Sequence, residues 1–485
     1  MSIVPRIFPY EYPRLTQVEI WGALRELKEK STVFLEAPTG VGKTAAILSY
    51  LLEKYDKVLW FCYTHKQQEV VLREAERIEE RTDIRLNTVL IRGISSLCPV
   101  REVREAIFPH QACRWYYSVY GCVHCPYKEQ FLKACSSRLI ITTYAYLKEP
   151  FFEKIAPLID FADVVVFDES HHLLLLPKIE IPIQWIKEAC REYECELFRE
   201  MLSRKKVVSI DESELFLLSS VGEEVLLKKS HSYCLEVARV LRGVNRVFYD
   251  RRDKYTGLRR DFHEFLKELL ENRRAVFISA TLPEQVKLIL SNGEFYRIGK
   301  HEYTFYPIIF TGVKLPKRAW RRFKVLKEVN WVISVTSRFY RKVLSVFPSR
   351  ELLEKYREYF KLPHNVIGIV AGSREAEGID IDADICVILG VPYDRVTRIT
   401  IETVKYFRKY TRKPKVLGYT IPAVIKAVQA AGRILRKPDK VIVFYDKRWL
   451  QLRKYFPAWL KHNNIKVVSK RSRLYSELVY YSCFS

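Results

Sequence analysis

Short runs of β-branched and other apolar residues recur along the chain, and turn or polar residues bound each run. Between several of them the apolar residues repeat with a helical period, as over 45–55 and 67–80. Strands that alternate with helices are typical of parallel sheets covered on both faces, so an α/β fold is predicted. The predicted strands are 32–36, 57–63, 139–143, 163–167, 275–279, 343–346, 366–370, 385–389 and 440–445.

Two stretches interrupt this alternation. Residues 96–137 are rich in cysteine and aromatic residues without a clear period, and residues 175–265 have a mostly helical pattern, over 185–203 and again over 258–271. Strand patterns resume after each stretch, so both are predicted as insertions in a first α/β domain. The predicted domains are a first α/β domain (1–95, 138–174 and 266–300), a cysteine-rich insertion (96–137), a helical insertion (175–265) and a second α/β domain with a basic C-terminal tail (301–485).

Composition excludes a disordered chain and indicates an anionic partner. The 485 residues are 48% hydrophobic, enough to bury several cores. Lys and Arg number 82 against 57 Asp and Glu, which gives a formal net charge of +25 and favours a polyanion as partner. No stretch is apolar for the 18 residues that a membrane helix needs, and residues 1–6 have no hydrophobic signal region. A soluble intracellular protein is therefore expected.

A phosphate-binding loop follows the first predicted strand. Its glycines let successive backbone N–H groups and the start of the next helix face a polyphosphate. Lys43 is expected to reach the outer phosphates and Thr44 the Mg²⁺ ion. The loop reads Ala37-Pro38-Thr39-Gly40-Val41-Gly42-Lys43-Thr44, with alanine in place of the usual first glycine.

A carboxylate pair, Asp168 and Glu169, ends the very apolar strand at 163–167. Alone, such a pair would usually be an acidic helix start. Beside a phosphate loop it indicates hydrolysis, with Asp168 holding Mg²⁺ and Glu169 polarising the attacking water. Far along the chain, Arg433 and Arg436 lie three residues apart on one helical face, after Gln429. Such a pair is often a solvated basic face, but it can also reach a γ-phosphate across a cleft.

The order of these elements resembles that of the XPD/DinG branch of superfamily 2, the iron-sulfur DNA helicases, over residues 6–450. Further matching segments are Phe8-Pro9-Tyr10 with Gln17, Tyr63-Thr64-His65-Lys66-Gln67, Ser279-Ala280-Thr281-Leu282, Val346-Phe347-Pro348-Ser349, Glu377-Gly378-Ile379-Asp380, Gly390-Val391-Pro392-Tyr393 and Asp446-Lys447-Arg448. Two departures stand out. Ser170 replaces an alanine of the family, and Gly372-Ser373-Arg374 replaces its Arg-Gly-Lys.

The resemblance implies two RecA-like parallel-sheet motor domains that close on ATP and Mg²⁺, with an iron-sulfur insertion and a helical arch in the first. Thr44 and Asp168 would bind the Mg²⁺. The implied catalytic residues are Lys43, Asp168, Glu169, Gln429, Arg433 and Arg436. The implied nucleotide-binding residues are Gln17, Thr39, Gly40, Val41, Gly42, Lys43, Thr44, Glu377, Gly378 and Asp380.

Four cysteines of the first insertion have metal-ligand spacing: Cys98, Cys113, Cys122 and Cys125. The spacing alone fits a tetrahedral zinc site or an iron-sulfur cluster. The family resemblance implies a [4Fe-4S] cluster, because its cluster lies at this place in the chain and its last ligand is also followed by proline and an aromatic residue. Cys135 is the competing fourth ligand.

The resemblance also implies 5′ to 3′ movement on single-stranded DNA, opening of forked DNA, and a role in repair. A DNA-stimulated translocase that separates no strands is the alternative. A monomer in the cytoplasm, associated with the nucleoid, is expected. Thr64, Gln67, Arg114, Tyr144 and Tyr393 are predicted to contact DNA. A basic segment with interleaved rings suits either strand binding or a solvated helix face: Lys317, Arg318, Trp320, Arg321, Arg322, Phe323 and Lys324.

Overall fold

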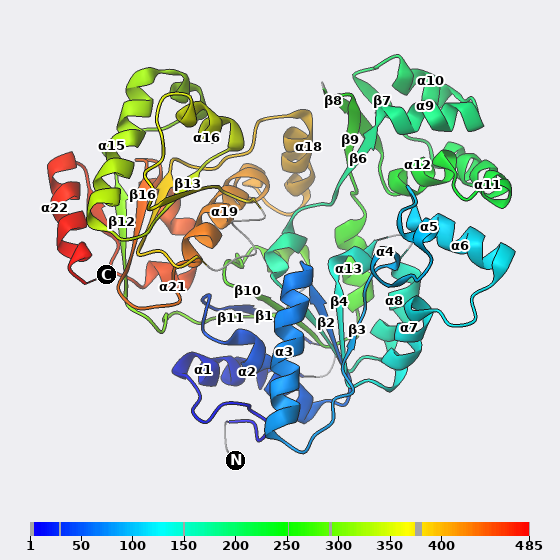
Figure 1. Cartoon of the computed structure of the whole chain (residues 1–485), viewed down its shortest axis with the longest axis horizontal. Helices are drawn as coiled ribbons and strands as arrows, with labels where there is room; N and C mark the ends of the chain where they lie inside the picture. The colour runs from blue at the N-terminus through cyan, green and yellow to red at the C-terminus, as the bar shows by residue number, and fades with distance from the viewer. Residues whose placement is uncertain are drawn as a thin grey trace.

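The computed structural model describes residues 4–28, 31–148, 151–250, 252–290, 293–373 and 381–484. Two parallel sheets lie side by side, and a smaller antiparallel sheet with its helices stands above the first (Figure 1). The predicted α/β class with two parallel-sheet lobes is confirmed. Within the described ranges, no helix is both long enough and apolar enough to cross a membrane.

The first sheet has seven parallel strands in the order β11-β1-β10-β5-β2-β4-β3. Alternate side chains of these strands enter two separate cores, which is why the strands read as continuous apolar runs. One core includes α1 (Leu15–Leu24), α2 (Lys43–Lys54) and α3 (His65–Arg81), and the other α8 (Phe152–Phe161) and α13 (Phe262–Leu270). The strands are β1 (Thr32–Glu36), β2 (Val58–Cys62), β3 (Val89–Leu90), β4 (Leu139–Thr143), β5 (Val164–Asp168), β10 (Ala275–Ser279) and β11 (Glu294–Arg297).

The second sheet has six parallel strands in the order β14-β13-β15-β16-β12-β17. Its strands are β12 (Phe305–Phe310), β13 (Val343–Phe347), β14 (Val366–Val370), β15 (Ile385–Leu389), β16 (Lys440–Tyr445) and β17 (Lys466–Val468). One face packs on α19 (Ile421–Gly432), α20 (Trp449–Leu452) and α21 (Ala458–Lys461). The other packs on α15 (Phe323–Phe339), α16 (Arg350–Arg357) and α22 (Arg471–Ser482).

The C-terminal segment, predicted as a basic tail, is folded into the second lobe. Its residues form β17, which pairs with β12, and α22, which buries Leu474 and Leu478 against the sheet. Its cations are partly paired, as in the contact of Arg471 with Glu328. The apolar residues of this segment recur at helical spacing between the charges, so the segment is an integral part of the lobe.

The second insertion contains the predicted helices and also an antiparallel sheet that the pattern did not predict. This sheet has four strands in the order β6-β9-β8-β7. The strands are β6 (Lys178–Pro182), β7 (Val207–Ser209), β8 (Arg246–Asp250) and β9 (Lys254–Leu258), and the helices are α9 (Ile183–Glu192), α10 (Glu196–Leu202), α11 (Glu212–Lys228) and α12 (Tyr233–Leu241). Strands of three to five residues with distant partners leave little local pattern.

The cysteine-rich insertion folds as short helices around a small core of its own. They are α4 (Ile94–Leu97), α5 (Arg101–Arg104), α6 (Pro109–Tyr120) and α7 (Pro126–Ser136). This insertion touches the larger one directly. The buried Gln111 amide donates to the Ser232 carbonyl at 3.1 Å and accepts from the Ser232 N–H at 2.7 Å. Arg114 pairs with Glu223 of α11 at 2.7 Å.

Candidate active site

The phosphate loop lies between β1 and α2. Gly40 and Gly42 have φ angles of +79° and +75°, a left-handed conformation that favours glycine. Lys43 begins α2, and its Nζ donates to the Pro38 carbonyl at 2.7 Å. Val41 is fully buried and anchors the loop. The loop therefore has the curled backbone that the sequence predicted.

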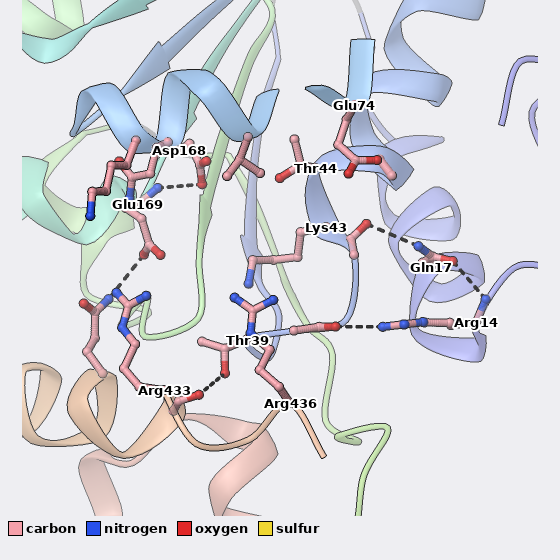
Figure 2. A pocket seen from close by; sticks show the side chains of 18 of the residues that line it. Arg14, Gln17, Thr39, Lys43, Thr44, Glu74, Asp168, Glu169, Arg433 and Arg436 are labelled. Atoms are coloured by element: carbon pink, nitrogen blue, oxygen red, sulfur yellow. Dashed lines mark hydrogen bonds between the residues drawn. The ribbon is translucent and has the colours of Figure 1, made fainter. Parts of the chain in front are cut away.

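Gln17 lies against this loop (Figure 2). Its Nε2 donates to the Gly42 carbonyl at 3.3 Å, and its Oε1 accepts from the Arg14 N–H at 2.9 Å. Arg14 donates to the Gly40 carbonyl at 2.7 Å and pairs with Glu302 of the second lobe at 2.7 Å. Gln17 thus fastens the start of α1 to the phosphate loop.

The carboxylate pair lies at the end of β5, beside β10. Glu169 has a φ of +51°, which turns the chain sharply after Asp168. Its Oε2 accepts from the Ser279 hydroxyl at 3.1 Å and the Gln429 amide at 3.2 Å, and lies 3.3 Å from His171 Nδ1. Glu169 therefore has partners from the short helix that follows β5, from β10 and from the second lobe.

Electrostatics separate the two carboxyls. Burial raises the pKa of Asp168 above its usual range, and the neighbouring Glu169 charge adds to this rise. Burial also acts to raise the pKa of Glu169, but the hydrogen bond and charge of His171, with the charge of Lys43, hold it below its usual range. Burial lowers the pKa of Lys43, and both carboxylates oppose this shift. Glu169 is accordingly kept ionised, as a base requires.

Arg433 and Arg436 follow directly after α19 and point toward the phosphate loop (Figure 2). The Thr39 hydroxyl donates to the Gly432 carbonyl at 3.1 Å, which ties the loop to the second lobe. A Cβ on Gly40 would lie 3.3 Å from Cδ of Arg436. Both arginine charges act to lower the pKa of Lys43. The two lobes therefore bring their cations to one place.

These groups enclose a cavity of about 530 Å³. Its lining includes the predicted Gln17, Thr39, Gly40, Gly42, Lys43, Thr44, Asp168, Glu169, Gln429, Arg433 and Arg436. Tyr10, Tyr12 and Glu74 line it as well. The predicted nucleotide-binding residues Glu377, Gly378 and Asp380 lie outside the described residues.

Thr64 and Gln67, predicted as DNA contacts, also line the nucleotide cavity. They form the capping box of α3: the Thr64 hydroxyl accepts from the Gln67 N–H at 3.3 Å, and Gln67 Oε1 accepts from the Thr64 N–H at 2.9 Å. Both side chains are thus engaged in starting a helix at the edge of the nucleotide site.

The other predicted DNA contacts differ in exposure. Tyr144 is a core residue that contacts Phe61 and Phe167, and its hydroxyl donates to the Asp168 carbonyl at 2.6 Å. Its ring therefore presents little surface to a DNA strand in this structure. Tyr393 is half-buried and stacks on Tyr419 at 4.9 Å. The predicted contact Arg114 is exposed.

The four candidate metal ligands share the core of the first insertion. Cys98 and Cys125 are buried there, and Cys113 and Cys122 pack against them. Burial raises the pKa of Cys113, and the charges of the other three thiols add to this rise. Cys135 is exposed, and its Sγ donates to the Phe131 carbonyl at 3.5 Å. Among described side chains, no group of three His, Cys, Asp or Glu was found that could hold a metal ion.

Sequence reasoning missed Glu36, the last residue of β1. Its carboxylate is buried and accepts from the Ala458 N–H of the second lobe at 2.6 Å. Burial raises the pKa of Glu36 to about 7, against the lowering effects of the Ala458 N–H and nearby cations. Trp459 donates to the Ala280 carbonyl at 2.8 Å in the same region. The apolar run that predicted β1 carries no signal of this contact.

The fold and the cavity define a two-lobed nucleotide hydrolase of the phosphate-loop class. Residues 17–191 match the DEAD/DEAH box helicase family, and residues 317–463 match the helicase C-terminal domain family. The ATP-dependent DNA helicase XPD of Sulfolobus acidocaldarius is 23% identical over 88% of this chain and 94% of that protein.

Solved structures show the same fold. An XPD helicase structure aligns with a TM-score of 0.69 at 19% identity over 95% of this chain and all of the other. Xpd4 of S. tokodaii aligns with a TM-score of 0.66 at 18% identity over 94% of this chain and all of the other. Both lobes therefore match helicase families, and the chain is an ATP-dependent helicase similar to the XPD type. The resemblance that the motifs indicated is confirmed.

Proposed function

We propose that the chain is a DNA helicase that moves 5′ to 3′ along single-stranded DNA, opens forked duplexes and serves DNA repair. The observation that carries this proposal is the cavity in which Lys43, Glu169 and Arg436 from two lobes meet. A relative with similar length is named an ATP-dependent DNA helicase. The net charge of +25 suits a polyanionic track.

Each catalytic residue has a role that its position supports. Lys43 contacts the outer phosphates of ATP, while Arg433 and Arg436 stabilise the negative charge that develops at the γ-phosphate. Thr44 and Asp168 would hold Mg²⁺, which would neutralise phosphate charge. Glu169, held by His171, Ser279 and Gln429, accepts the proton of the attacking water.

The contacts between the lobes couple ATP hydrolysis to a movement of one lobe relative to the other. Thr39 of the phosphate loop donates to Gly432 of the second lobe, and His301 Nε2 lies 3.1 Å from the Thr39 carbonyl. Loss of the γ-phosphate removes the anion between Lys43 and the two arginines, so these cations then repel one another. Repeated closure and opening would move the lobes along one strand, provided that the two lobes hold the strand in turn. Gln17, Val41, Glu377, Gly378 and Asp380 remain proposed nucleotide-binding residues.

Four thiols of the first insertion are the proposed ligands of a [4Fe-4S] cluster: Cys98, Cys113, Cys122 and Cys125. Their deprotonated sulfurs suit such a cluster, which would join α4, α6 and α7 into one rigid unit. The mutual electrostatic effect of these four thiols supports this choice over the exposed Cys135. Iron and sulfide analysis of anaerobically purified protein should give about four of each per chain. Colourless, zinc-loaded protein would reject the cluster.

The remaining predictions belong to the same proposal. The chain would act as a monomer in the cytoplasm, on chromosomal DNA, with the domain division predicted from the sequence. Thr64, Gln67, Tyr393 and Arg114 remain the proposed DNA contacts that lie at least partly at the surface.

Unwinding of forked DNA tests the proposal directly. Labelled duplexes that carry only a 5′ tail or only a 3′ tail are incubated with protein, ATP and Mg²⁺. Displacement of the strand from the 5′-tailed duplex alone is expected. DNA-stimulated ATP hydrolysis without displacement from either duplex would instead establish a translocase that separates no strands.

A further inference from the structure

A patch of exposed cations and rings lies on the second lobe, at the start of α15. We call it the α15 patch; its members are Arg318, Arg321, Arg322, Phe323, Lys324, Lys327 and Tyr359, all exposed. No ion pair joins Arg318, Arg321, Arg322 or Lys324 to a described acidic residue. Figure 1 places α15 at the outer side of the second lobe, and none of the patch residues lines the nucleotide cavity.

Fold stability does not explain these cations. The segment is anchored by Trp320 and Leu326, which are 0% and 1% exposed. The cations between these anchors lie near the N-terminal end of a 17-residue helix, where the helix dipole disfavours positive charge. They also repel one another. A partner with negative charge would remove both costs.

The rings of the patch form a platform. Phe323 and Tyr359 are 48% and 51% exposed, and their centroids lie 5.5 Å apart. Phe360 lies nearly parallel to Phe323 at 6.0 Å, and Lys327 Nζ lies 4.8 Å from the Phe323 centroid. Exposed rings held in place among cations suit a base that stacks while its phosphate pairs.

The patch adjoins the edge of the sheet that carries Tyr393. Leu315, just before the patch, lies close to Gly390, since a Cβ there would be 3.2 Å from the Leu315 carbonyl oxygen. The charges of Asp394 and Arg395 act on Lys317. A strand that passes the loop after β15 can therefore continue onto the α15 patch.

We propose that the α15 patch binds a single-stranded segment of DNA outside the nucleotide cleft. Arg318, Arg321, Arg322 and Lys324 contact its phosphates, and a base stacks on Phe323 or Tyr359. This inference rests on the proposed function, because it extends the track of the same strand. It assigns the patch to a nucleic acid rather than to an acidic protein, because exposed rings directly beside cations suit bases that stack next to their own phosphates.

Charge reversal tests the patch on the full-length protein. The variant Arg321→Glu/Arg322→Glu/Lys324→Glu is compared with Arg25→Glu/Lys28→Glu/Arg85→Glu, which changes the same charge at exposed positions of the first lobe. Anisotropy of a labelled 40-nucleotide single strand is followed over a salt series. The patch variant should bind at least about tenfold more weakly, with a salt slope lower by about two, since each phosphate contact on a single strand contributes roughly 0.7. The control should bind within about twofold of the wild type.

Phe323→Ala tests the platform without a change of charge, and should weaken binding about tenfold while the salt slope stays the same. DNA-independent ATP hydrolysis within twofold of the wild type shows that each variant is folded. Wild-type affinity in both variants would overturn the inference, as would loss of polyglutamate binding with DNA binding intact. If the wild type itself neither binds DNA nor hydrolyses ATP faster with DNA, the proposed function fails; if it does both, a failed variant test counts against the patch alone.

Discussion

Two of the regions in which the described parts of the lobes meet have opposite character. Around the nucleotide cavity they face each other with charged groups, and a few polar contacts such as Thr39 to Gly432 join them. Between α13 and α18 (Arg398–Tyr406) they share one apolar core, in which Tyr406 and Phe407 pack with Phe262. Charged groups across a hydrated cavity separate at little cost, whereas parting the apolar contact would expose buried surface. We therefore expect the lobes to move about the second region.

The packed region also reaches the catalytic strand. His263 is fully buried, its Nδ1 lies 3.0 Å from the Tyr406 hydroxyl, and its Nε2 lies 2.9 Å from the carbonyl of Leu173. Leu173 belongs to the short helix that directly follows Glu169. An element of the second lobe is thus fixed to the segment that carries the proposed base.

The largest effect is expected from Lys43→Ala at the cavity. Lys43 is the first residue of α2, and the charges of both carboxylates and both arginines act on it. Phosphate release should fall by about 1,000-fold, as expected for loss of a cation at a developing charge. Lys54→Ala, at the other end of α2, should keep wild-type rates. Residual hydrolysis above a tenth of the wild-type rate would contradict the role given to the charged groups at the cavity.

His263→Ala addresses the packed region. The change opens a cavity and leaves the Tyr406 hydroxyl and the Leu173 carbonyl without this partner. The free energy of unfolding should fall by about 3 kcal/mol, measured by denaturant titration. ATP affinity should stay within about threefold. His364→Ala, at an exposed position, is the control and should match the wild type. Unchanged stability would show that the packed region is not a fixed contact.

The pH dependence of stability gives a smaller effect at the same residue. Burial lowers the pKa of His263 to about 4, from about 6.5 when unfolded. Between these values the unfolded chain binds the proton and the folded chain does not, so stability falls as pH drops below 6.5. From pH 7 to 5 the wild type should lose about 2 kcal/mol more than His263→Phe. Equal losses would mean that His263 is protonated when folded.

The parallel strands could be predicted from the sequence because burial on both faces leaves continuous apolar runs. Thr32–Glu36 and Lys440–Tyr445 have the predicted bounds. β12 was missed; it contains Pro307, which cannot donate to the sheet. The short strands β6 to β9 depend on partners far apart in the chain, which no local pattern reveals.

The candidate site was predictable to the extent that it is local. Lys43 and Glu169 follow strands in recognisable segments, so their place at the sheet edge followed from the pattern. The direction of a side chain did not follow from the pattern, so the sequence did not reveal that Tyr144 is a core residue. Contacts between lobes, such as those of Glu36 and His263, depend on the tertiary fold alone.

Arg436→Ala tests most directly whether both lobes act on one triphosphate. ATP affinity and single-turnover hydrolysis are measured together, with Lys437→Ala as the control, because Lys437 is exposed and pairs with Asp382 at 3.0 Å. The account predicts ATP affinity within about threefold of the wild type and hydrolysis at least about 100-fold slower. Hydrolysis at the wild-type rate would contradict it.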